Sequence, residues 1–163
     1  MKRLLLFCIG LLLAGLGVAM GSTPGLGTSP ISSLPYVTTF IIPWRFGAAT
    51  IIINIVFFLG QIAILKRRFR AFQIIQLPML VVFGLCIDLG VWLTGFFIPQ
   101  SYILKLLETV FGCFVLAVGV WLQIRADITL LPGDAFIKVV ADEYRLVFGT
   151  VKICFDCSVS LLL

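Results

Sequence analysis

An unbroken apolar stretch near the amino terminus decides the class of fold: residues Leu4–Gly21 read LLLFCIGLLLAGLGVAMG. A helix of about 20 mostly apolar residues is long enough to cross a bilayer. The rest of the chain is similar, since 61% of the 163 residues are hydrophobic, 12% are charged and the mean hydropathy is +1.21. A soluble domain is about half apolar and about a quarter charged. The sequence therefore predicts an integral membrane protein.

Further apolar stretches predict five spanning helices in total. They cover Leu4–Gly21, Phe46–Leu65, Ile74–Ile98, Ile103–Leu122 and Leu146–Leu163. A shorter stretch, Ile31–Ile42, is closed by Pro30 and Pro43 and is typical of a half-helix, either re-entrant or interfacial. We expect an all-α polytopic protein with one transmembrane domain over residues 1–163.

The loop charges predict the orientation of these spans, because lysine and arginine gather on the cytoplasmic side. One side carries nine of them: Lys2, Arg3, Lys66, Arg67, Arg68, Arg70, Arg125, Lys138 and Arg145. The other side carries Arg45 and Lys105. We expect a cytoplasmic amino terminus and an uncleaved first helix, although this helix also imitates a signal peptide. The net charge of +5 is then a topology signal that needs no nucleic acid to explain it.

Two features of the composition exclude most catalytic chemistry. The chain has no histidine, which removes histidine-based acid–base catalysis, Ser-His-Asp triads and histidine–metal sites. Its five cysteines all fall in apolar stretches, where we expect small buried hydrophobic residues: Cys8, Cys86, Cys113, Cys154 and Cys157. Cys154 and Cys157 form a C-x-x-C, but no βαβ pattern surrounds it. We expect no enzyme activity, no metal site and no cofactor.

The two ends of the chain share their glycine and proline spacing when one is shifted by 102 positions. Gly10 then meets Gly112, Gly17 meets Gly119, Pro30 meets Pro132, Phe46-Gly47 meets Phe148-Gly149, and Asn54 meets Asp156. Glycine and proline mark backbone geometry, so their agreement indicates an internal repeat. We expect one repeat over residues 1–102 and an incomplete second repeat over residues 103–163.

The repeat has a topological consequence. Residues 1–102 contain three predicted spans, an odd number, so the second repeat begins on the opposite face of the membrane. The loop charges agree with this inversion, and inverted repeats are common in secondary transporters. A complete second repeat would add a sixth span, so we expect a truncated copy.

Several polar side chains lie within predicted spans, where each needs a partner or a water-filled cavity. Asp88 lies midway along its span, and Asn54 is the counterpart of Asp156 in the repeat. Lys152 and Asp156 are four residues apart and share a helix face, so they form either a self-compensating pair or part of a cavity. A second hypothesis pairs Lys152 with Asp88 across the bundle.

The two short helices begin with similar polar sequences. Thr28 and Ser29 precede Pro30, and Ser32 follows it; Asp134 follows Pro132 in the second repeat. Proline suits the first turn of a helix, and Thr28 or Ser29 is a candidate cap. These residues either cap their own helices, with Asp134 complementing the helix dipole, or help to bind a solute at the helix openings.

A G-x-x-x-G pattern, Gly17 to Gly21, lies in the first helix. Small residues allow close packing of helices in lipid. We expect these glycines to pack the first helix against another helix of the same chain rather than to form a dimer interface. A homo-oligomer formed through other surfaces is an alternative that the sequence does not decide.

The passage from Gly25 to Val37, with Phe46-Gly47 and Asn54, resembles the YczE/YyaS/YitT group of bacterial integral membrane proteins. The second half is similar through Leu131–Ala135, Phe148–Ile153 and Asp156. The resemblance implies five or six spans in a bacterial inner membrane, with a cytoplasmic amino terminus and no assigned activity. Members of the group usually continue beyond the Lys-x-x-x-Asp helix.

The sequence leaves two functions open. One is a small-solute transporter or permease-like protein in the lipid bilayer, with candidate binding residues Thr28, Ser29, Ser32, Asn54, Asp88, Asp134, Lys152 and Asp156. The other is a non-transporting accessory or scaffold membrane protein. The polar residues converge on one cavity in the first case and scatter among helix contacts in the second.

Overall fold

The computed structural model describes the chain except for residues 1, 67–70, 97–99, 127, 129 and 163. Arg67, Arg68 and Arg70 of the basic loop lie outside the described residues. The described residues form seven α-helices and the 3-10 helix η2 (Ala71–Ile75), with no strand among them. The α-helices are α1 (Lys2–Ser22), α2 (Pro30–Ile41), α3 (Phe46–Leu65), α4 (Gln76–Thr94), α5 (Tyr102–Ala126), α6 (Pro132–Glu143) and α7 (Phe148–Leu162).

Within the described residues, four segments are long and apolar enough to cross a membrane: α1, α3, Gln73–Thr94 and α5. They confirm four of the five predicted spans. The fifth, over Leu146–Leu163, differs, because α7 has 15 described residues. At about 1.5 Å per residue such a helix is shorter than a hydrocarbon core of about 30 Å.

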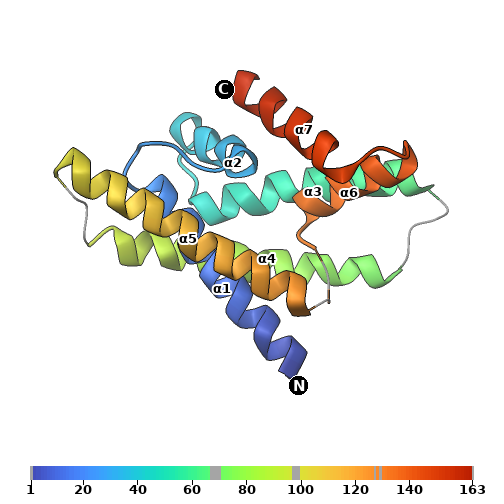
Figure 1. Ribbon diagram of the computed structural model, residues 1–163, viewed down its shortest axis with the longest axis horizontal. Helices are drawn as coiled ribbons and strands as arrows, with labels where there is room; N and C mark the ends of the chain where they lie inside the picture. Colours follow the sequence, from blue (N-terminus) through green and yellow to red (C-terminus); the bar gives the residue numbers. More distant parts are fainter. Residues whose placement is uncertain (1, 67–70, 97–99, 127, 129, 163) are drawn as a thin grey trace.

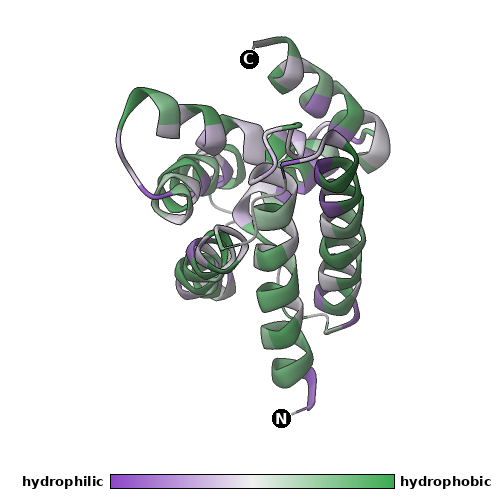
Figure 2. Cartoon of the chain, turned by 90° about the vertical axis from the view of Figure 1, so that its left-hand side faces the viewer, coloured by the Kyte–Doolittle hydropathy of each residue, from purple (hydrophilic) through white to green (hydrophobic). Residues whose placement is uncertain are grey.

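The four long helices consist of hydrophobic residues along most of their length (Figure 2), and many of these residues are exposed. Val56, Trp92 and Phe114 are more than 60% exposed. In water such a surface would be an aggregation liability, whereas in a bilayer it contacts lipid tails. The chain is a multi-pass membrane protein by this pattern.

Helix α1 lies at the centre of the bundle and packs on both α4 and α5. Its residues Phe7, Leu11, Ala14 and Val18 belong to the main buried core. One face of α1 is therefore covered by protein, while apolar residues of its other face, such as Leu5 and Leu12, are exposed.

Helices α1 and α5 run antiparallel and approach closely through glycines (Figure 1). A Cβ atom at Gly10 would lie 2.9 Å from the carbonyl oxygen of Gly119, and one at Gly17 would lie 2.5 Å from the backbone nitrogen of Leu116. The Gln123 Nε2 donates a hydrogen bond of 3.2 Å to the Gly10 carbonyl. The predicted use of the Gly17 pattern for packing within the chain is confirmed.

The predicted half-helix is confirmed as α2, and its counterpart is the equally short α6, with 12 residues in each. Helix α2 packs on α3 and α7, while α6 packs on the same two helices. In Figure 1, α2 lies over one end of α3 and the turn between α6 and α7 lies at the other end. The short helices therefore approach α3 from opposite ends of the bundle.

The five cysteines are free, and Cys86 alone is partly buried. The prediction that they are buried is wrong for the other four, which are exposed: Cys8, Cys113, Cys154 and Cys157. An apolar sequence context does not distinguish the face of a membrane helix that contacts protein from the face that contacts lipid.

Candidate functional site

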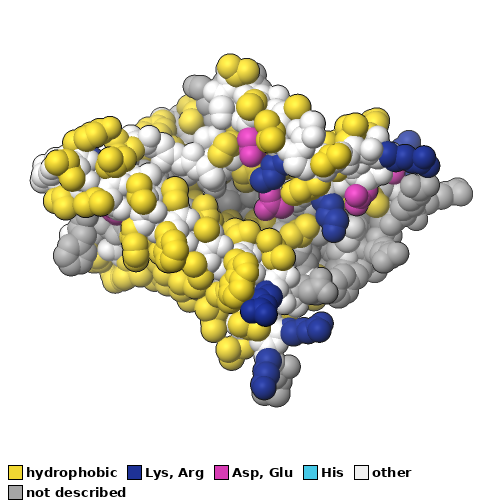
Figure 3. Space-filling model, in the orientation of Figure 1, with side chains coloured by type: hydrophobic (Ala, Val, Ile, Leu, Met, Phe, Trp, Pro, Cys, Tyr) yellow, Lys and Arg dark blue, Asp and Glu magenta, His cyan; other side chains and the backbone are white. Residues whose placement is uncertain are grey.

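A cavity of about 670 Å³ lies where α2 and α6 begin, and it is also lined by α1, α3, α4, α5 and α7. Charged side chains gather beside this hollow on the face shown in Figure 3. Six of the eight predicted binding residues line it: Ser29, Ser32, Asn54, Asp134, Lys152 and Asp156. Thr28 and Asp88 do not line it.

The first residues of α2 and α6 meet inside the bundle. The residue before each helix is extended, with φ and ψ of −64° and 148° at Ser29 and of −62° and 149° at Leu131. A proline follows in both cases, and its fixed φ suits the first helical turn. A Cβ atom at Gly133 would lie 3.6 Å from the side chain of Ile31, so ordinary van der Waals contact joins the two helix starts.

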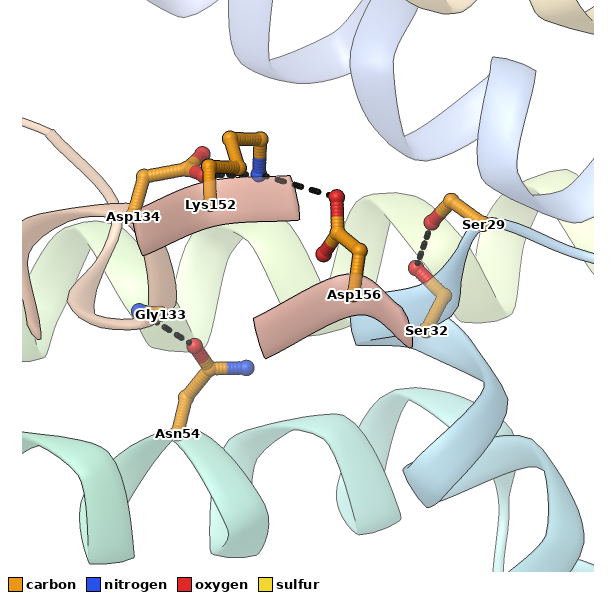
Figure 4. Close-up of polar contacts among 7 residues, drawn as sticks. All are labelled: Ser29, Ser32, Asn54, Gly133, Asp134, Lys152 and Asp156. Carbon is orange, nitrogen blue, oxygen red and sulfur yellow. Dashed lines mark hydrogen bonds and ion pairs between the residues drawn. The ribbon is translucent and has the colours of Figure 1, made fainter. Parts of the chain in front are cut away.

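Asn54 ties α3 to the start of α6 (Figure 4). Its Oδ1 accepts a hydrogen bond of 3.0 Å from the Gly133 N–H, and its Nδ2 donates one of 2.9 Å to the Thr50 carbonyl. Asn54 is 5% exposed, so both polar atoms are used inside the protein. The amide satisfies an N–H group that the first turn of a helix leaves without an intrahelical partner.

Gln61, seven residues further along α3, makes a second contact with the same turn. Its Nε2 donates a hydrogen bond of 2.8 Å to the Pro132 carbonyl. Gln61 is fully buried, and its Oε1 has no hydrogen-bond partner. Together Asn54 and Gln61 hold α6 at a fixed position on α3. The spacing of residues along α3 does not predict this partner of Gln61.

Lys152 of α7 binds carboxylates from two helices (Figure 4). Its Nζ lies 2.9 Å from Asp134 Oδ1 of α6 and 4.0 Å from Asp156 Oδ2 of its own helix. The predicted Lys152–Asp156 pair is confirmed at the outer limit of an ion pair. Asp134 is the first-turn acid of α6, as predicted, and it also holds α6 to α7.

Asp156 is less well compensated than Asp134, the other carboxylate beside Lys152. Its Oδ1 is buried and has no hydrogen-bond partner, while Oδ2 has Lys152 only at 4.0 Å. In the view of Figure 4 it lies between the Lys152–Asp134 pair and the Ser29–Ser32 pair. A carboxylate in this position can accept hydrogen bonds from a molecule in the cavity.

Ser29 occupies the predicted cap position of α2, but its side chain does not make the capping hydrogen bond. Ser29 is the residue before the helix, yet no side-chain hydrogen bond caps the helix. The Ser29 hydroxyl donates instead to Ser32 Oγ at 2.9 Å. Thr28 lies one residue earlier, so the prediction of a Thr28 or Ser29 cap is wrong. The two serines contribute hydroxyl groups to the cavity wall.

Asp88 lies on α4 and binds a different helix from the one proposed. The Gly47 N–H donates a hydrogen bond of 2.7 Å to Asp88 Oδ1. This bond satisfies a free N–H at the start of α3. The hypothesis of an Asp88–Lys152 pair is wrong, because Lys152 is held by Asp134 and Asp88 caps α3.

Four further polar residues of the cavity wall were not predicted as binding residues: Thr50, Gln123, Lys138 and Asp142. Asp134, Lys138 and Asp142 are four residues apart along α6 and therefore share one face. That spacing is visible in the sequence, but Lys138 was assigned only to loop topology. Across the residues that the structure describes, no group of three or more acidic, cysteine or histidine side chains is placed to hold a metal ion.

Comparison with protein-family models identifies the family of this chain. A family model described as "Family of unknown function (DUF6198)" matches residues 1–163. The chain belongs to the DUF6198 family. No curated protein and no solved structure gave a significant match. No named relative links this DUF6198 chain to the YczE/YyaS/YitT group, so that resemblance stays a prediction.

Proposed function

We propose that the protein is a small-solute transporter and that the cavity between α2, α6 and α7 is its solute site. The convergence of six predicted polar residues on one cavity carries the proposal. A volume of about 670 Å³ is in the range of small-molecule sites. Ionisable residues within a membrane domain are costly and usually serve a pathway or a site. A scaffold would not need them in a shared cavity.

The proposal includes an inverted repeat, which the helix boundaries support. Helices α2 and α6 begin at Pro30 and Pro132, and α3 and α7 begin at Phe46 and Phe148. Both pairs differ by the 102 positions of the sequence repeat. The contacts follow the same relation, since α3 packs on α6 as its counterpart α7 packs on α2.

The packing of α1 on α5 supports the inversion further. These counterpart helices run antiparallel, and each uses the same face. The face of α1 carries Gly10, Ala14, Gly17 and Gly21, and the face of α5 carries the positions 102 residues later: Gly112, Leu116, Gly119 and Gln123. A pseudo-two-fold axis in the membrane plane relates helices in this way.

The two short helices are held differently, which suits alternating access. Asn54 and Gln61 bind the start of α6. Among the described residues, no hydrogen bond or ion pair joins α2 to α7. The counterpart of the Asn54–Gly133 bond would join Asp156 to the Ile31 N–H. In the proposed opposite state, Asp156 accepts that bond and Asn54 releases Gly133.

The location follows from the same proposal. The protein lies in a bacterial inner membrane with its amino terminus in the cytoplasm, so the α2–α3 turn is external and the α6–α7 turn is cytoplasmic. Its activity is not enzymatic and uses no cofactor. Solute binding and a change of access need no group that breaks covalent bonds.

Two-sided labelling tests the inverted topology. Ile42 and Tyr144 are 44% and 69% exposed, lie after α2 and α6, and occupy equivalent repeat positions. Each is replaced by cysteine in a chain without the five native cysteines, and a membrane-impermeant maleimide is added to oriented vesicles. We expect Ile42→Cys to react from outside and Tyr144→Cys from inside. Reaction of both from one side contradicts the inverted repeat.

A cavity residue tests transport itself. Ser29 lines the cavity and is partly exposed. In the same background, Ser29→Cys should react from each side of the membrane, because a transporter exposes its site alternately. Ile42→Cys and Tyr144→Cys serve as one-sided controls. Reaction of Ser29→Cys from one side only would favour the scaffold function.

A further inference from the structure

Negatively charged side chains outnumber positively charged ones on the inner wall of the cavity. Asp134, Lys152 and Asp156 are partly buried, and together they carry one negative charge in excess. Lys138 and Asp142 also line the cavity, but both are exposed and offset each other. Water and salt screen the exposed pair much more than the inner three residues. The inner wall therefore favours an occupant with one positive charge.

The excess charge is centred on Asp156. Lys152 lies 2.9 Å from Asp134 and 4.0 Å from Asp156, so its shorter contact is with the carboxylate of α6. The buried Asp156 Oδ1 accepts no hydrogen bond. A partly buried carboxylate is favoured when hydrogen-bond donors and positive charge compensate it. An ammonium group supplies both.

The rest of the wall indicates what the ammonium is attached to. Val18, Phe83 and Leu116 line the cavity and are apolar, and the first two are 4% and 7% exposed. A hydrated inorganic cation gains nothing from such a wall, whereas a hydrocarbon group is removed from water by it. Within the described part of the chain, no three acidic, cysteine or histidine side chains are grouped to hold a metal ion.

We propose that the solute is a small organic monocation, a primary or secondary ammonium on a hydrocarbon body, whose N–H groups bind the partly exposed Asp156 carboxylate. This inference rests on the proposed transport function and names the substrate class. The hydrocarbon body lies against the wall formed by Val18, Phe83 and Leu116. Lys152 stays with Asp134 and repels a second positive charge, which limits the solute to one.

Three aromatic compounds of similar size test the inference with the purified full-length chain: benzylammonium, benzyl alcohol and benzoate. Binding is measured by titration calorimetry, with sodium chloride matched in all samples. We expect saturable binding of benzylammonium alone, weakened at least tenfold in Asp156→Asn. Asparagine is the residue at the equivalent position 54, so this variant is compatible with the local fold. Asp88→Asn removes a carboxylate outside the cavity and should bind within threefold of the parent chain.

The outcomes separate this inference from the transport proposal. Binding of benzoate, equal binding of benzyl alcohol, or binding of none of the three overturns the monocation assignment. So does an equal loss of benzylammonium binding in both asparagine variants. If Ser29→Cys still reacts from both membrane sides in those cases, the transport proposal stands and only the substrate class is wrong. One-sided reaction removes the transport proposal whichever compound binds.

Discussion

Lys152 Nζ lies 2.9 Å from Asp134 Oδ1, so an ion pair joins α7 to the first turn of α6. The two side chains are 35% and 36% exposed. The pair fixes the relative position of two helices that line the cavity, and it separates Lys152 from Asp88. The lysine is thus part of the cavity wall rather than a partner for the carboxylate of α4.

A double-mutant cycle should detect this pairing. Lys152→Met and Asp134→Asn are expected to couple by about 0.5–1 kcal/mol, because half-exposed ion pairs are weak. The measurement is thermal unfolding in detergent, followed by tryptophan fluorescence. Lys152→Met combined with Asp88→Asn is the control and should be additive. Coupling in the control cycle and additivity in the first would restore the Asp88–Lys152 pair.

Asn54 and Gln61 should differ in their effect on stability although both bind the start of α6. Asn54→Leu removes two hydrogen bonds and leaves the buried Gly133 N–H without a partner, so we expect a loss of about 1–2 kcal/mol. Gln61→Met removes one bond but also a buried oxygen that has no partner, so its cost should be smaller.

The same unfolding measurement compares these two variants, both of which nearly preserve side-chain volume. An Asn54→Asp variant keeps an acceptor for the Gly133 N–H and should recover part of the loss. A Gln61→Met variant less stable than Asn54→Leu would show that Asn54 is not the stronger contact.

Glycines on α5 and α7 should respond in opposite ways to alanine. A Cβ atom at Gly119 would lie 2.5 Å from the backbone nitrogen of Ala14, and backbone cannot move aside cheaply. We expect Gly119→Ala to destabilise the fold by about 2–3 kcal/mol. A Cβ atom at Gly149 meets nothing within 4 Å, so Gly149→Ala should be neutral or stabilising by up to about 1 kcal/mol. Detergent-extracted yield and melting temperature measure both effects, and similar losses in the two variants would contradict the close α1–α5 packing.

Residue patterns predicted the parts of the fold that depend on local sequence, namely where helices begin and how long they are. Prolines at positions 30 and 132 and the apolar lengths around them gave α2, α6 and the four long helices, because helix starts and spanning lengths are local properties. Asn54, Lys152 and Asp156 of the cavity wall were predicted because a charge or amide within an apolar stretch is unusual wherever it lies. Ser29, Ser32 and Asp134 were predicted because they lie beside the prolines that begin the two short helices.

The side-chain contacts between different helices were not predictable from these local patterns. The choice of Asp134 over Asp88 by Lys152 depends on how α6 and α7 pack, and spacing within one helix contains no such information. Cys8 and Cys113 were expected inside because both faces of a membrane helix are apolar. Lys138 was counted as a loop charge because the end of α6 could not be read from the sequence.

The contact between the two helix starts can be tested by cross-linking. In the chain without native cysteines, Ile31→Cys and Gly133→Cys should form a disulfide on mild oxidation, because the Ile31 side chain lies 3.6 Å from a Cβ atom at Gly133. Phe40→Cys with Gly133→Cys is the control, since Phe40 is near the far end of α2 and 73% exposed. A mobility shift on non-reducing gels detects the bond. If the transport proposal holds, the bond should also restrict Ser29→Cys to reaction from one side of the membrane. Equal cross-linking of both pairs would show that the start of α2 is not held beside α6.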